Sequence, residues 1–187
     1  MPKVHMIRHG KPSAAWGGDD LDPGLDEAGR AQAEEAARAL LALPVPPQRV
    51  VSSPLRRCRE TAEPFARALG IGIEIDPAVG EVPTPAGVPH EARPAWLRKA
   101  FGGRWSEIEG DLNYESWRAD VARAVQRHEG AAIFSHYVAI NAAVSLATGN
   151  DRVLAFRPDH CSISTFDVTP SGLILIDKGR EAATQVL

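Results

Sequence analysis

The alternation of short apolar runs with amphipathic helical patterns constrains the fold of this chain more than any other feature. Runs typical of buried strands are followed by stretches in which apolar residues recur every three or four positions. The expected strands are 3–7, 48–52, 71–76, 131–135, 162–168 and 173–177, and the expected helices are 26–43, 54–69, 117–128 and 138–147. This order predicts a three-layer α/β/α sandwich around a mostly parallel sheet, in one domain over residues 1–187.

Local signals refine this outline at two places. Ser53 and Pro54 predict an N-cap and a proline in the first turn of the helix 54–69. The last two strands are joined by a short turn, which predicts a hairpin with an antiparallel strand at one edge of the sheet.

Residues 77–112 interrupt the alternation. This segment contains five prolines together with Trp96, Phe101 and Trp105. Because it is too long for a simple connection, we expect a loop or a small helical cap over one end of the sheet.

Composition excludes several classes of partner. The net charge of −3 gives no reason to expect nucleic acid or an anionic membrane. No run approaches the roughly 18 apolar residues of a membrane span, and the N-terminal run has no cleavage site of a signal peptide. Cys58 and Cys161 form neither a disulfide framework nor a CxxC pair. We therefore expect a cytoplasmic protein, whose oligomeric state the sequence does not indicate.

Cationic and imidazole side chains follow three of the predicted strands. In chain order, these are Arg8-His9-Gly10, Arg56-Arg57 and His136. Ligands of open α/β sheets bind at the carboxyl ends of the strands, and arginine forks match phosphate oxygens. The three strand ends therefore predict a pocket for a tetrahedral dianion. The helical pattern leaves open whether Arg56 or Arg57 faces it, because both lie far from the buried stripe of that helix.

Five motifs resemble the branch of the histidine phosphatase superfamily that includes the cofactor-dependent phosphoglycerate mutases. They are RHG (8–10), DPGLDEAGRAQA (22–33), SSPLRRCRETA (52–62), the single acidic residue after Asp76 in DPAVGEVP (76–83), and SH (135–136). RHG alone is a weak signal. The five motifs occur in the family's order and cover nearly the whole chain, so together they are specific.

The resemblance implies a role for each of five residues. His9 matches the nucleophile that becomes a phosphohistidine, and Glu81 matches the acid that protonates the leaving oxygen. Arg8, Arg57 and His136 match the phosphate-binding residues. A proton donor needs a raised pKa, which we expect partial burial to provide for Glu81. Other carboxylates remain alternatives to Glu81 as the acid, namely Glu74, Glu91 and Glu107.

Three further residues are expected to contact the substrate: Gly10, Lys11 and Tyr137. Tyr137 replaces the family's usual glycine, and Lys11 stands where an acidic residue is common. The segments SAAWGG (13–18) and VPTPAGVP (82–89) lack features of the mutases, which favours hydrolysis over recapture of the product. His160 and the remaining histidines are expected to be structural, although His160 precedes a strand from which it can reach the pocket.

The expected function is metal-independent hydrolysis of a phosphomonoester, with no cofactor, because a neutral imidazole is itself a nucleophile near neutral pH. The expected substrate is a small phosphorylated metabolite or a phosphoprotein. Two alternatives stay open: a phosphotransferase of the mutase type on the same site, and a phosphate-binding regulatory module with little turnover.

Overall fold

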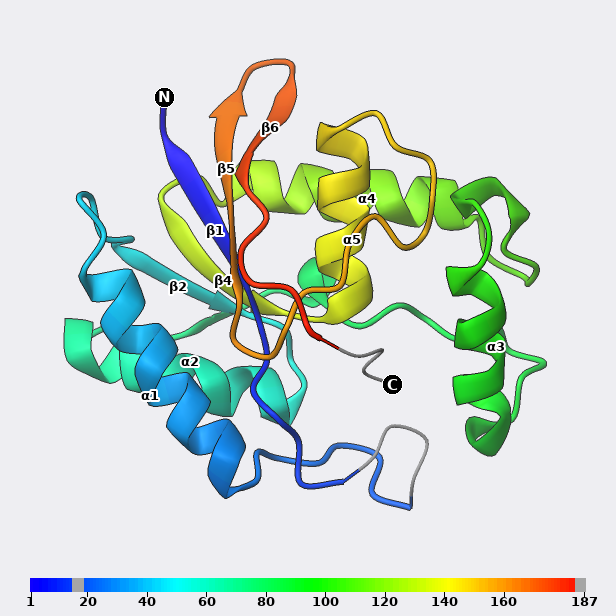
Figure 1. Ribbon diagram of the computed structural model, residues 1–187, viewed down its shortest axis with the longest axis horizontal. Coiled ribbons are helices and arrows are strands. Elements are labelled where there is room, and N and C mark those ends of the chain that lie inside the picture. The colour runs from blue at the N-terminus through cyan, green and yellow to red at the C-terminus, as the bar shows by residue number, and fades with distance from the viewer. Residues whose placement is uncertain (15–18, 184–187) are drawn as a thin grey trace.

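The structure, a computed structural model, describes residues 1–14 and 19–183 (Figure 1). Within these residues one sheet has six strands in the order β3-β2-β4-β1-β5-β6. The strands are β1 (Lys3–Arg8), β2 (Arg49–Ser52), β3 (Glu74–Ile75), β4 (Ala131–Ser135), β5 (Ile163–Thr169) and β6 (Gly172–Asp177). The first four are mutually parallel, whereas β5 runs antiparallel to β1 and to β6. The mostly parallel sheet with a hairpin at one edge confirms the predicted fold class.

Helices cover both faces of the sheet, as predicted. In Figure 1, α1 (Glu27–Leu41) and α2 (Arg56–Leu69) lie on one side, and α4 (Tyr114–Arg127) and α5 (Tyr137–Ala147) on the other. Successive strand residues point to opposite faces. Accordingly, Ile7 belongs to the core beneath α1 and α2, while its neighbour Met6 belongs to the core beneath α4 and α5.

The segment 77–112 contains a short helix, α3 (Arg93–Phe101), and three 3-10 turns, at Pro77–Val79, His90–Ala92 and Trp105–Glu107. Leu97 and Phe101 of α3 are buried and join the core beneath α4 and α5. Figure 1 places α3 apart from both helix layers. No helix in the described part of the chain is long and apolar enough to cross a membrane.

The start of α2 differs from the prediction that Ser53 caps it. The helix begins at Arg56, and its N-cap residue, Leu55, makes no side-chain capping bond. Asp22, from the loop before α1, accepts the hydrogen bond of the Arg56 backbone N–H at 2.8 Å. Oγ of Ser53 accepts the backbone N–H of Leu55 at 3.4 Å and also lies 2.7 Å from Nε2 of His136.

The strand predicted over 71–76 is reduced to two residues, Glu74 and Ile75. Both are exposed at the sheet edge, so no burial extends the pairing with β2.

Candidate active site

The glycine of RHG allows the end of β1 to pass close to the start of α1. A Cβ atom added at Gly10 would lie 2.7 Å from the carbonyl oxygen of Gly29, too close for any other residue. The backbone N–H of Gly10 donates to Oγ1 of Thr61 at 2.9 Å, and this hydroxyl donates to the carbonyl of Arg57 at 2.6 Å. The strand end is thereby held against both α1 and α2.

The ring of His9 is fixed in one tautomer. Its Nδ1 lies 2.8 Å from the carbonyl oxygen of Gly10. A carbonyl only accepts hydrogen bonds, so Nδ1 carries the proton and Nε2 keeps its lone pair. Burial, assisted by the charges of Arg57 and Arg8, holds the pKa of His9 well below its ordinary value. His9 lines a cleft, so a neutral imidazole with a free nitrogen faces the space where a ligand can bind.

Arg8 is buried beside this imidazole and lines the same cleft. Its Nη1 donates to the carbonyl of Pro158 at 3.0 Å, and its guanidinium carbon lies 5.0 Å from the ring centroid of Tyr137. Burial lowers the pKa of Arg8 to about 10, so it is still cationic at neutral pH. Its Nε is buried without a hydrogen-bond partner among the described residues. An N–H group in this position can donate a hydrogen bond to an anion that binds in the cleft.

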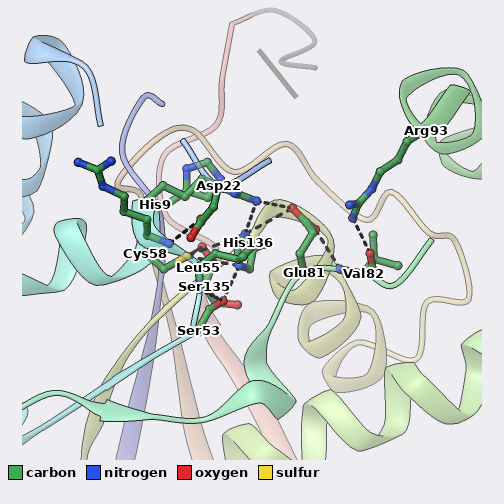
Figure 2. Close-up of polar contacts among 12 residues, drawn as sticks. His9, Asp22, Ser53, Leu55, Cys58, Glu81, Val82, Arg93, Ser135 and His136 are labelled. Carbon is green, nitrogen blue, oxygen red and sulfur yellow. Dashed lines mark hydrogen bonds and ion pairs between the residues drawn. The ribbon is translucent and has the colours of Figure 1, made fainter. Parts of the chain in front are cut away.

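Arg57, Glu81 and His136 form a triangle of polar contacts, of which Figure 2 labels Glu81 and His136. Nη2 of Arg57 lies 3.2 Å from Oε2 of Glu81, and Nδ1 of His136 lies 3.3 Å from each of these two atoms. Arg57 and His136 are buried, and Glu81 lines the cleft. The structure therefore brings together residues from α2, from the loop after the turn Pro77–Val79, and from the end of β4.

The expectation that the pKa of Glu81 is raised is wrong for this structure. Burial does favour the neutral acid, but His136, Arg57 and Arg93 outweigh burial and hold the pKa of Glu81 well below its usual range. Burial also lowers the pKa of His136. His136 lowers the pKa of Glu81 most, and the charge of Arg57, 3.2 Å away, adds to this effect.

The structure distinguishes Arg57 from Arg56, which the helical pattern left open, and Glu81 from the alternative acids. Arg56 is exposed and pairs with Glu60 at 2.6 Å, whereas its neighbour Arg57 is buried at the cleft. The three alternative acids, Glu74, Glu91 and Glu107, are exposed and do not line the cleft.

The cleft has a volume of about 510 Å³, so it accommodates more than a phosphate group. Lys11 lies at its wall and forms an ion pair with Asp26 at 3.0 Å. Tyr137 lines the cleft as well; burial raises its pKa to about 12, and its hydroxyl has no hydrogen-bond partner in the described regions. Of the SAAWGG segment, residues 15–18 lie outside the described residues.

Helix α3 forms the wall next to Glu81. Arg93, Leu97 and Phe101 are spaced four residues apart on one face of α3, and all three line the cleft. Arg93 donates through Nη2 to the carbonyl of Val82 at 2.9 Å, next in sequence to Glu81 (Figure 2).

Sequence reasoning missed two residues of the site and undervalued a third. Arg93 belongs to no motif, although the spacing of positions 93, 97 and 101 is a usable signal. Ser53 is part of the SSPL motif but was assigned to capping, whereas it contacts His136. His160 was expected to be structural, yet it lines the cleft with its ring centroid 5.9 Å from that of His9.

No group of three or more histidine, cysteine, aspartate or glutamate side chains within residues 1–14 and 19–183 gathers in a way that could hold a metal ion.

Comparisons with solved structures find the same fold. The phosphoserine phosphatase of Entamoeba histolytica in complex with 3-phosphoglyceric acid superposes with a TM-score of 0.75 at 19% identity, over 96% of this chain and 98% of that one. A mycobacterial glucosyl-3-phosphoglycerate phosphatase in complex with VO3 gives 0.71 at 21% identity, over 98% and 100%.

A partial sequence match is to the transcription factor tau 55 kDa subunit of Saccharomyces cerevisiae, 38% identical over 79 residues. It covers 37% of this chain and only 18% of that protein. The family match is much broader, since it spans residues 4–178. With the motifs, the fold and this match in agreement, the chain belongs to the histidine phosphatase superfamily (branch 1).

Proposed function

We propose that this protein is a phosphatase of the histidine phosphatase type, which hydrolyses phosphomonoesters through a phosphohistidine on His9 and needs no metal ion. The observation that carries the proposal is the free Nε2 of a neutral His9 at a cleft lined by Arg8 and Arg57. Two guanidinium groups match the oxygens of a phosphoryl group and stabilise the charge that spreads over them during transfer.

In the first step, Nε2 of His9 attacks the phosphorus atom and the phosphorus–oxygen bond of the ester breaks. The electron pair leaves with the ester oxygen, which takes a proton from Glu81. The low pKa of Glu81 depends on Arg57 and His136. A phosphate dianion that binds these two residues draws their hydrogen bonds away from Glu81 and adds negative charge nearby. Substrate binding therefore raises the pKa of Glu81, and its carboxylate takes up a proton from solvent before the ester bond breaks.

In the second step, a water molecule attacks the phosphorus atom and the phosphorus–nitrogen bond breaks. The electron pair returns to Nε2 of His9, and the proton of the water passes to the carboxylate of Glu81. Inorganic phosphate leaves with His9 neutral again, and Glu81 returns its proton to solvent once the phosphate has gone.

We further propose a small phosphorylated metabolite as the substrate. The cleft of about 510 Å³ is suited to a small leaving group, and solved proteins of the same fold are named for phosphoserine and glucosyl-3-phosphoglycerate.

The two free cysteines, Cys58 and Cys161, are both buried and agree with a reducing, cytoplasmic location.

The test is the release of p-nitrophenol from p-nitrophenyl phosphate in excess EDTA, with wild type and His9→Ala. We expect turnover that survives the chelator and is abolished by the substitution, in a variant whose circular dichroism is unchanged. Wild-type protein quenched in alkali should carry one phosphoryl group on His9, detected by mass spectrometry. Activity that persists in His9→Ala, or that EDTA removes, refutes the proposal. Transfer of the group to an added diol in preference to water favours a phosphotransferase.

A further inference from the structure

The topology brings a third imidazole to His9. Strand β1 lies between β4 and β5, and the register pairs Arg8 with Ser135 on one side and Ile7 with Ile163 on the other. Because β5 is antiparallel to β1, its first residue lies at the edge of the sheet where β1 and β4 end. Residues just before β5 therefore approach the end of β1 from the side opposite β4.

His136 and His160 lie on these two sides of His9. The ring centroid of His9 is 5.4 Å from that of His136 and 5.9 Å from that of His160. His136 follows β4, and His160 precedes β5. A phosphoryl group on Nε2 of His9 would thus have imidazoles on two sides.

The backbone around His160 is held in an unusual conformation. Cys161 has a φ of 56°, and no other non-glycine residue in the described ranges has a positive φ. Its N–H donates to the carbonyl of Arg8 at 3.0 Å, which joins this turn directly to the RHG strand end. A non-glycine residue in the left-handed region costs free energy, and such strain gathers at functional sites.

Two side chains clamp the same turn. Oδ1 of Asp159 accepts the backbone N–H of His160 at 2.8 Å. Arg180 donates to Oδ2 of Asp159 at 2.9 Å and to the carbonyl of His160 at 3.0 Å. The main chain of His160 is therefore fixed at both its N–H and its carbonyl.

The ring of His160, in contrast, has nitrogen atoms without a hydrogen-bond partner among the residues that the structure describes, and it lines the cleft. The charged groups that face it are Arg8, Lys11, Asp26 and Asp159. Burial, assisted by Arg8, lowers the pKa of His160 to about 4. At neutral pH the ring is thus uncharged, with one N–H to donate and one nitrogen to accept.

We propose that His160 is a third histidine of the phosphoryl site, whose ring N–H donates to a non-bridging oxygen of the group carried by His9, on the side away from His136. The proposal rests on the proposed function, and it assigns a contact to a residue that none of the five family motifs includes. A hydrogen bond to such an oxygen strengthens as charge develops on it during transfer.

The kinetic test compares His160→Ala with His160→Gln on p-nitrophenyl phosphate. Loss of a hydrogen bond to a charged oxygen should lower kcat by roughly 10- to 100-fold in His160→Ala, with a smaller change in KM. His160→Gln keeps an N–H donor and should recover a large part of the loss. Equal losses in both variants, together with a lowered Tm, would mean a structural role and overturn the proposal.

A second experiment follows the imidazoles directly. Protein labelled with ¹⁵N at histidine is titrated with inorganic phosphate, and the signals are assigned from the spectra of His160→Gln and His136→Gln. We expect the signals of His136 and His160 to shift together with one apparent Kd. A shift of His136 alone overturns the role of His160 and leaves the proposed function standing. If neither signal shifts, phosphate does not bind between these rings, and both proposals fail.

Discussion

Nη2 of Arg57 lies 3.2 Å from Oε2 of Glu81, so the arginine proposed to bind phosphate also pairs with the carboxylate proposed to protonate the leaving group. His136 contacts both. A phosphoryl group that takes hydrogen bonds from Arg57 and His136 therefore competes with Glu81 for them. The proposed mechanism therefore couples the protonation of Glu81 to the arrival of substrate.

Removal of the acid should affect poor leaving groups most. In Glu81→Gln, we expect kcat for an alkyl phosphate to fall by about 10²- to 10⁴-fold, because the departing alkoxide then lacks a proton donor. The loss for p-nitrophenyl phosphate should be much smaller, since p-nitrophenolate leaves without protonation. Glu107→Gln, at an exposed position, is the control. Equal losses on the two substrates would argue that Glu81 has a binding role instead.

Substitutions of the adjacent residues Arg56 and Arg57 should change kcat/KM to very different extents. Arg57→Ala removes a buried guanidinium at the cleft and should lower kcat/KM by about 10²- to 10³-fold. Arg56→Ala removes an exposed ion pair with Glu60 and should leave kcat/KM nearly unchanged. Steady-state kinetics with p-nitrophenyl phosphate measure both. If kcat/KM fell more in Arg56→Ala than in Arg57→Ala, the assignment of Arg57 to the phosphate would be contradicted.

Substitution of Ser53 should lower kcat, because its hydroxyl contacts His136. Ser53→Ala removes the hydroxyl 2.7 Å from Nε2 of His136, so this imidazole loses one of the contacts that hold its orientation. We expect a fall in kcat of about 10-fold, as for the loss of one hydrogen bond. Ser52→Ala is a matched control: it removes an equally buried hydroxyl that bonds the carbonyl of Ser53 instead. The role of Ser53 would be refuted by similar kcat values for the two variants.

Buried neutral histidines should make folding stability depend on pH. Burial lowers the pKa of His9 and of His136 below the ordinary value of 6.5. Below pH 6.5 the unfolded chain therefore binds protons that the folded protein does not. The free energy of unfolding is highest above this pH and falls as the pH drops, by up to about 1.4 kcal/mol per pH unit for each histidine.

Urea denaturation at a series of pH values measures this slope. His9→Gln should be less sensitive to pH than wild type, because one of the buried histidines with a lowered pKa is gone. An unchanged slope in His9→Gln would show that His9 is protonated in the folded protein.

Much of the fold was predictable from local patterns. The spacing of apolar residues along a strand or helix predicts which of them face the core. Four residues predicted in this way are all buried: Ile7, Leu40, Phe65 and Ile133. The short strand β3 was overestimated because an exposed edge supplies little packing to extend it.

The order of elements and the chemistry at the ends of β1 and β4 follow from the amino-acid sequence, whose motifs also select Arg57 over Arg56. The ionisation of Glu81 and the approach of His160 to His9 follow only from the folded arrangement. Both depend on neighbours remote in the chain. The pKa of a carboxyl follows the charges within a few ångströms of it, and the position of His160 follows from the pairing of β5 with β1.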